Sequence, residues 1–178
     1  MFRSAQLNDT TIAVIGLGQV GLRLAVEIGR HRSVIGFDDN PDRVHNLQCE
    51  YDHTRDISDE CLAQARHLAY TSAPREIAHC RTYIVTVPMP VDTAHRPDTS
   101  PLVKASETVG RLLKRGDLVI FDNTNNTASA AEICVPLLEH NSGLRFNHNF
   151  FCWLAERCES TWNELLTQTQ PMPPRPTA

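Results

Sequence analysis

Lysine is scarce in this 178-residue sequence, which contains only Lys104 and Lys114, and its basic residues form no continuous strip. The formal net charge is −4 and the pI is near 6.0, so nothing in the composition favours nucleic acid or an anionic membrane as a partner. No segment approaches the roughly 20 apolar residues of a membrane span. We expect no signal peptide, because the longest apolar run near the N-terminus, Ile12 to Ile15, is short and precedes a glycine. These absences favour a cytoplasmic protein.

Metal-ligand spacing is also missing. The six cysteines, at positions 49, 61, 80, 134, 152 and 158, include no Cys-x-x-Cys pair. We therefore expect free thiols in a reducing compartment and no metal site. The hydrophobic content of 41% is ordinary for a globular chain of this length, which can bury one good core but hardly a second full domain.

Short apolar runs alternate with amphipathic segments as far as about residue 150. Strands are predicted at 11–15, 33–37, 68–71, 81–87, 118–121 and 144–150, and helices at 19–30, 41–49, 58–66, 101–113 and 129–140. Neighbouring parallel strands need a crossover, and these helices have suitable lengths for one. The pattern predicts an α/β fold, a Rossmann-like doubly wound parallel sheet with helices on both faces.

A glycine motif opens the first helix. Residues 16–21 read Gly-Leu-Gly-Gln-Val-Gly, directly after a predicted strand, which is the context that the GxGxxG motif of dinucleotide-binding proteins requires. Gly16 would make the tight turn, Gly18 would let the backbone approach a pyrophosphate, and Gly21 would let helix and sheet pack closely. The phosphates would then lie at the positive end of the helix dipole. FAD could use the same turn, so the motif alone leaves the cofactor open.

Acidic residues after the second strand favour NAD over NADP. Asp38 follows that strand about twenty residues after the glycines, where a carboxylate accepts hydrogen bonds from the adenosine ribose. Asp39 adds a second negative charge where a 2′-phosphate would lie. Arg43 is the only basic residue that the sequence places nearby.

Four segments carry a resemblance to a known family. They are residues 12–18 (Ile-Ala-Val-Ile-Gly-Leu-Gly), 34–38 (Val-Ile-Gly-Phe-Asp), 83–88 (Tyr-Ile-Val-Thr-Val-Pro) and 104–110 (Lys-Ala-Ser-Glu-Thr-Val-Gly). Together they resemble the N-terminal NAD-binding domain of the UDP-glucose/GDP-mannose dehydrogenase family, most closely its UDP-N-acetylhexosamine 6-dehydrogenase branch. The resemblance is strong over residues 11–122 and faint from there to about 157.

The resemblance implies an oxidoreductase of polysaccharide biosynthesis that turns a UDP-sugar alcohol into a uronic acid and reduces two NAD+. The implied cofactor contacts are Gly16, Gly18, Gln19, Val20, Gly21, Asp38, Arg43, Val87, Pro88 and Thr124. Thr124 and Glu156 are the candidates for catalytic roles, as a residue that positions water and as an acid/base. With this assignment we expect an NAD-binding Rossmann domain over 1–150, a short terminal helix over 151–169 and a disordered proline-rich tail over 170–178.

The chain also departs from the family pattern. Gln19 stands for a tyrosine, Arg23 for a proline and Met89 for a threonine, and neither lysine nor any cysteine matches the catalytic ones of the family. Two hypotheses follow: the NAD-binding part of a nucleotide-sugar 6-dehydrogenase whose UDP-sugar site another chain could complete, or a catalytically inactive homologue that acts as an NAD-binding or interaction module. In both we expect the isolated chain to be inactive. A short-chain dehydrogenase is excluded, because no tyrosine is followed four positions later by lysine.

Overall fold

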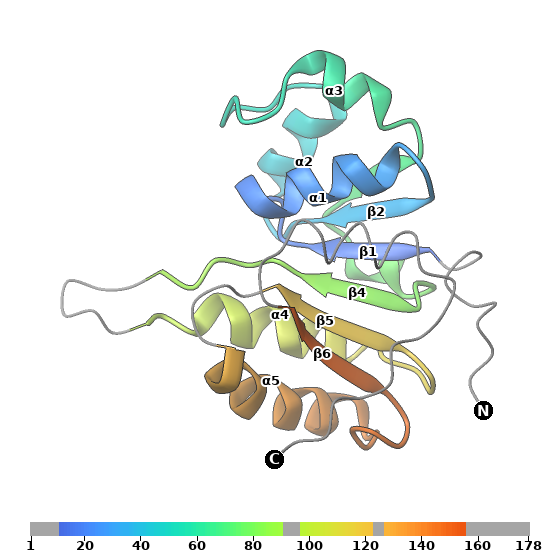
Figure 1. Ribbon diagram of the computed structural model, residues 1–178, viewed down its shortest axis with the longest axis vertical. Coiled ribbons are helices and arrows are strands. Elements are labelled where there is room, and N and C mark those ends of the chain that lie inside the picture. The colour runs from blue at the N-terminus through green and yellow to red at the C-terminus, as the bar shows by residue number, and fades with distance from the viewer. Residues whose placement is uncertain (1–10, 91–96, 123–126, 156–178) are drawn as a thin grey trace.

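The sheet of this protein has the strand order of a dinucleotide-binding fold. The computed structural model describes residues 11–90, 97–122 and 127–155, with side chains described except at 127–131, 154 and 155. Within these residues six strands form a sheet of order β3-β2-β1-β4-β5-β6 (Figure 1). The strands are β1 (Ile12–Ile15), β2 (Val34–Phe37), β3 (Leu68–Thr71), β4 (Thr82–Val85), β5 (Leu118–Asp122) and β6 (Phe151–Ala155).

Helices connect these strands and cover both faces of the sheet. They are α1 (Gln19–Gly29), α2 (Pro41–Gln48), α3 (Asp59–Gln64), α4 (Ser100–Gly110) and α5 (Thr127–Ser142), with a short 3-10 helix, η1 (Pro74–Ile77). Every strand pair is parallel. This strand order with helical crossovers is that of the doubly wound Rossmann fold, so the fold class expected from the sequence is confirmed.

Alternate residues of the central strands enter two separate cores. Ile12 and Val14 of β1 pack in a cluster with residues of α1, α2 and α3. Ala13 and Ile15 of the same strand pack in a second cluster, with residues of α4 and α5. Figure 1 shows the two sets of helices on opposite sides of the sheet. A strand that is buried on both faces must be apolar throughout, which explains why the runs show no alternation of polar residues.

The start of α2 agrees with the signals in the sequence. Asn40 is the N-cap residue, and its side-chain oxygen accepts hydrogen bonds from the backbone amides of Asp42 and Arg43. Pro41 occupies the first helical position, where no N–H is needed. This cap fixes the direction in which the chain leaves β2, and with it the position of the residues between β2 and α2.

The last strand begins later than the sequence suggested. Residues 144–150 were predicted as a strand, but they form a turn with an isolated bridge between Phe146 and Phe150, and the strand is Phe151–Ala155. The apolar residues of this segment resemble a strand pattern, yet Asn147 has a φ of 58° and interrupts the extended backbone. The terminal helix predicted for 151–169 is therefore wrong for residues 151–155, and the sheet continues past the expected boundary at 150. The remainder of that helix and the tail at 170–178 lie outside the described residues.

Candidate dinucleotide site

The candidate site lies where the strand order reverses, between the carboxyl ends of β1 and β4. Gly16 follows β1 and Val87 follows β4, and a β-carbon added to Gly16 would lie 3.0 Å from Cγ1 of Val87. In open parallel sheets of this kind, ligands bind in the crevice at this switch point. Pro88 follows with its side chain exposed.

The glycines of the turn differ in what surrounds them. Gly16 has a φ of +95°, a conformation that favours glycine. A β-carbon on Gly21 would lie 1.9 Å from the carbonyl oxygen of Gly16, so helix and turn pack too closely for any side chain there. A β-carbon on Gly18 would meet nothing within 4 Å. Gly18 is thus the position of the turn that borders open space.

The N-terminus of α1 faces this open space without a side-chain cap. Gly18 is its N-cap residue, and no side chain in the described part of the protein caps the helix. Val20, half-buried, lies in the first turn. Backbone N–H groups at such a terminus and the helix dipole favour a phosphate group. The residues therefore fit the pyrophosphate of a dinucleotide.

A threonine that sequence reasoning missed supports the turn from β4. The buried hydroxyl of Thr86 lies 3.0 Å from the carbonyl oxygen of Ile15 and 2.8 Å from that of Gly16, and it donates to this pair of acceptors. It also lies 2.3 Å from where a β-carbon of Gly21 would be. Threonine is common in strands for its β-branched shape alone, so nothing in the local sequence distinguishes this residue.

Asp38 lies beside the glycine turn. Its Oδ2 accepts a hydrogen bond of 2.8 Å from the backbone amide of Leu17, and its Oδ1 accepts one of 3.0 Å from that of Asn40. The side chain is partly exposed. The carboxylate is thus placed at the end of β2, next to the turn, as a contact with the adenosine ribose requires; that contact itself stays a prediction.

Asp39 is not a free negative charge. Its Oδ2 lies 2.5 Å from Nζ of Lys104, which extends from the exposed side of α4. The expectation that Arg43 is the only basic residue nearby is therefore wrong, because the fold brings α4 to the same edge of the sheet. The pairing raises the pKa of Lys104 through the hydrogen bond and the charge of Asp39. Asp39 alone therefore contributes less repulsion toward a 2′-phosphate than the sequence suggested.

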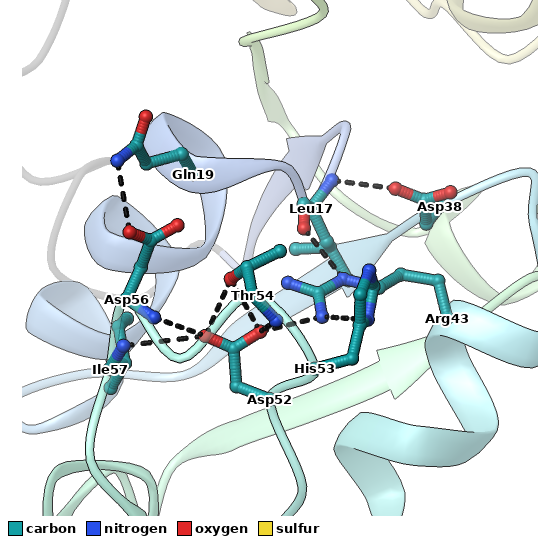
Figure 2. A network of polar contacts seen from close by, with 9 residues as sticks. All are labelled: Leu17, Gln19, Asp38, Arg43, Asp52, His53, Thr54, Asp56 and Ile57. Carbon is teal, nitrogen blue, oxygen red and sulfur yellow. Dashed lines mark hydrogen bonds and ion pairs between the residues drawn. The ribbon is translucent and has the colours of Figure 1, made fainter.

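Arg43 lies beneath the turn, not on its exposed side. Only 5% of its surface is exposed; its Nε donates to the carbonyl oxygen of Leu17 at 3.0 Å, and Nη1 lies 2.7 Å from Oδ1 of Asp52 (Figure 2). Nη1 also lies 2.9 Å from Nδ1 of His53. The predicted contact of Arg43 with the cofactor remains a prediction; what the structure adds is that this side chain binds the backbone of the turn.

Asp52 is a buried carboxylate that sequence reasoning missed. Burial alone would raise its pKa, but the hydrogen bonds from Arg43 and Thr54 and the charge of Arg43 bring the pKa below its usual value. The carboxylate is thus ionised at neutral pH and balances the charge of Arg43. An aspartate followed two residues later by threonine is a common loop signal, so its sequence did not mark it as a site residue.

Gln19 connects the start of α1 to the same segment. Its Nε2 donates a hydrogen bond of 2.9 Å to Oδ1 of Asp56, and both side chains are visible in Figure 2. The two candidates for catalytic roles, Thr124 and Glu156, lie outside the described residues. Thr124 as a cofactor contact is likewise outside them.

Three of the described cysteine thiols, those of Cys80, Cys134 and Cys152, are shifted away from the reactive thiolate form. Burial raises the pKa of Cys80 and Cys134 to about 11 and that of Cys152 to about 12, so these groups are protonated at neutral pH. Over the described ranges there is no group of three side chains that could hold a metal ion. Across the same ranges, no helix combines the length and apolar character of a membrane span.

The reversed strand order, the glycine turn at the switch point and the carboxylate at the end of β2 define a dinucleotide-binding Rossmann domain. The chain belongs to the UDP-glucose/GDP-mannose dehydrogenase family, because the model of that family's NAD binding domain matches residues 10–158. Its cofactor is accordingly NAD, and the resemblance stated from the sequence is confirmed.

Relatives with known names match over most of this chain but only part of their own length. The chain is 46% identical over 145 residues to UDP-N-acetyl-D-glucosamine 6-dehydrogenase of Pseudomonas aeruginosa. This alignment covers 82% of this chain and 34% of the relative. It is 40% identical over 143 residues to Protein CapL of Staphylococcus aureus, covering 80% of this chain and 34% of the relative. The chain therefore spans about a third of the length of these relatives.

Solved structures agree on the fold. UDP-D-ManNAc dehydrogenase of Pyrococcus horikoshii aligns with a TM-score of 0.73 at 26% identity, over 87% of this chain and 38% of that one. A ternary complex of GDP-mannose dehydrogenase from Pseudomonas aeruginosa aligns with a TM-score of 0.69 over 86% of this chain and 38% of that one. At 19% identity the second likeness supports the fold alone.

Proposed function

We propose that this chain supplies the NAD half of a nucleotide-sugar 6-dehydrogenase, in which a UDP-N-acetylhexosamine is oxidised at C6. The observation that carries the cofactor half is the open space at Gly18, beside the uncapped N-terminus of α1 and the carboxylate of Asp38. The sugar class is proposed from the names of the relatives at 46% and 40% identity. On the same grounds we propose that the protein is cytoplasmic and acts in polysaccharide biosynthesis.

Within this proposal, the pyrophosphate, the adenosine ribose and the nicotinamide each lie against named residues. The pyrophosphate binds the backbone of residues 18–20 at the start of α1, and the adenosine ribose binds Asp38. Val87 and Pro88 border the crevice from the end of β4, on the side where the nicotinamide enters. When bound, NAD+ supplies the hydride acceptor, and the chain's residues orient it.

Within this proposal, another polypeptide supplies part of the substrate chemistry. A covalent step on the aldehyde needs a thiolate, and the described cysteines with raised pKa values are protonated at neutral pH. An oxyanion needs a cation or a positioned donor, but Nζ of Lys104 pairs with Asp39 and that of Lys114 donates to the carbonyl of Ala78. We therefore propose that a polypeptide of these 178 residues binds NAD without oxidising UDP-sugars.

The second candidate function, an NAD-binding or interaction module without oxidoreductase activity, is favoured by Met89. The resemblance implies a threonine hydroxyl near the nicotinamide at this position. Met89 instead packs, partly buried, against the core under α4 and α5. This chain lacks the hydroxyl but has the dinucleotide turn. That combination is what a protein that binds NAD without turning over a substrate requires.

One experiment separates these functions. The 178-residue polypeptide is titrated with NAD+ by calorimetry, and NADH formation is followed at 340 nm with UDP-N-acetylglucosamine, alone and with the remaining two thirds of the Pseudomonas aeruginosa relative added as a separate polypeptide. Binding with turnover only in the mixture supports the dehydrogenase half. Binding without turnover in either case supports the module, and no binding contradicts both.

A further inference from the structure

A buried ion pair connects the glycine turn to a segment that follows α2. Arg43 and Asp52 have side chains only 6% and 1% exposed, and they meet at 2.7 Å. Arg43 extends from this pair to the carbonyl oxygen of Leu17, the residue between the first two glycines of the motif.

The Asp52 carboxylate is held in place from its own segment. It accepts hydrogen bonds from the backbone amides of Thr54, Asp56 and Ile57 and from the hydroxyl of Thr54, as the dashed lines of Figure 2 show. A carboxylate with this many donors has one orientation only. The side chain of Arg43, bound to it, is fixed as well, and so is the Nε–H that Arg43 directs at Leu17.

Holding the Leu17 carbonyl also directs the next amide. The peptide bond from Leu17 to Gly18 is planar and trans, as no cis bond occurs in the described residues, so its C=O and N–H point in opposite directions. Because Arg43 binds the Leu17 oxygen, the N–H of Gly18 points away from Arg43. The other side of Leu17 is fixed by the hydrogen bond from its amide to Asp38.

We propose that Asp52 is a positioning residue of the dinucleotide site, which acts through Arg43 and Leu17 to aim the Gly18 amide at the pyrophosphate. This inference rests on the proposed binding of NAD at the turn. The bond from Gln19 to Asp56 attaches the same segment to the first residue of α1, so residues 52–57 fix the turn at two points. Both contacts reach variable positions of the GxGxxG motif. Arg43 binds the backbone of Leu17, and Asp56 binds the side chain of Gln19.

The test compares the same change at two buried aspartates, each of which pairs with an arginine. Asp52→Asn removes the counter-charge of Arg43. Asp117→Asn removes the counter-charge of Arg81, whose side chain is 36% exposed. Asp117 is fully buried and lies 3.1 Å from Nε of Arg81 at the amino end of β5, the opposite edge of the sheet. Each variant loses the charge of a buried aspartate that pairs with an arginine, so a general loss of stability affects both. Only Asp52→Asn disturbs the turn.

We expect Asp52→Asn to weaken NAD+ binding about tenfold in calorimetry, the effect of one lost charge-assisted hydrogen bond. Asp117→Asn should stay within about twofold, since distant sites act independently. Hydrogen exchange of the Leu17 amide should accelerate in Asp52→Asn and not in Asp117→Asn, whereas amides in the middle of β1 should behave alike in both. This second measurement needs no cofactor.

Arg43→Lys keeps a cation opposite Asp52 and serves if Asp52→Asn does not fold. A single ammonium group cannot reproduce the guanidinium geometry that spans Asp52 and the Leu17 carbonyl, so we expect the same loss of affinity and the same faster exchange. Wild-type affinity with wild-type exchange at Leu17 in either folded variant overturns the inference. A wild-type chain that fails to bind NAD+ overturns the proposed function instead, and with it the assignment of Asp52 to that site.

Discussion

Gly18 and Gly21 stand three residues apart in the same motif, yet the structure predicts opposite consequences when each receives a side chain. At Gly21 a β-carbon would lie 1.9 Å from the carbonyl oxygen of Gly16 and 2.3 Å from the hydroxyl of Thr86. The obstacle is largely backbone, which cannot rotate away. Gly21→Ala should therefore destabilise the fold by about 1–3 kcal/mol, the usual cost of forcing extra volume into a packed site.

At Gly18 a β-carbon meets nothing within 4 Å, and the residue has a φ of −70°, which any amino acid adopts. Alanine is a poorer N-cap than glycine by a few tenths of a kcal/mol or more, but it lowers the entropy of the unfolded chain, so Gly18→Ala should change stability by less than about 1 kcal/mol. The space that a side chain fills is the space assigned to the pyrophosphate. Gly18→Val should accordingly weaken NAD+ at least about tenfold, or 1.4 kcal/mol.

Urea unfolding and calorimetric titration of the wild type and these three variants check both statements. Gly21→Ala should show the lower midpoint, and Gly18→Val should unfold like the wild type while losing NAD+. The reasoning is refuted if Gly18→Val keeps both its stability and its affinity, because the dinucleotide would then lie elsewhere. It is also refuted if Gly21→Ala is as stable as the wild type.

Three further predictions concern charge and reactivity. Asp39→Asn should raise the affinity for NADP+ about twofold to fivefold and leave the affinity for NAD+ little changed, because it frees Lys104. Calorimetry should show no such gain when Lys104→Ala is added, and a gain that persists in the double variant would refute the pairing. Folding lowers the pKa of Asp52, so this carboxylate contributes stability above the ordinary aspartate pKa and loses that contribution as the pH falls through the lower folded pKa. An acid titration followed by circular dichroism should therefore show a shallower loss of stability below about pH 4 for Asp52→Asn than for the wild type. Absorbance at 340 nm should show no turnover of UDP-sugars by the 178-residue polypeptide, and steady turnover that disappears in Cys152→Ser would contradict this.

Local signals in the sequence were sufficient for the fold and for the dinucleotide turn. The strand before the glycines, the helix after them and the Asn40 cap are each determined by residues that lie close together in the chain. Asp38 could be located because the spacing between the first and second strands of such folds is nearly constant. For the strand, the helix and the cap, neighbours in sequence are also neighbours in space, whereas Asp38 lies 21 residues from its partner Leu17.

The features that were missed depend on residues distant in sequence. Thr86 supports a turn about seventy positions earlier, as the contact from its hydroxyl to Gly16 shows. The pairing of Lys104 with Asp39 joins two helix–strand units, and Asp52 becomes important only because Arg43 faces it. The last strand was misplaced for a local reason instead: Asn147 adopts a positive φ that the apolar pattern around it does not reveal.

Calorimetric titration of the 178-residue polypeptide with NAD+ and NADP+, in the wild type and in Asp38→Ala, tests the central claim most directly. Asp59→Ala, an exposed aspartate at the start of α3, is the matched control. The wild type and the control should bind one NAD+ per chain, at least about tenfold more tightly than NADP+, and Asp38→Ala should weaken NAD+ and narrow that gap. No binding of NAD+, or equal affinities for the two cofactors in the wild type, would contradict the account.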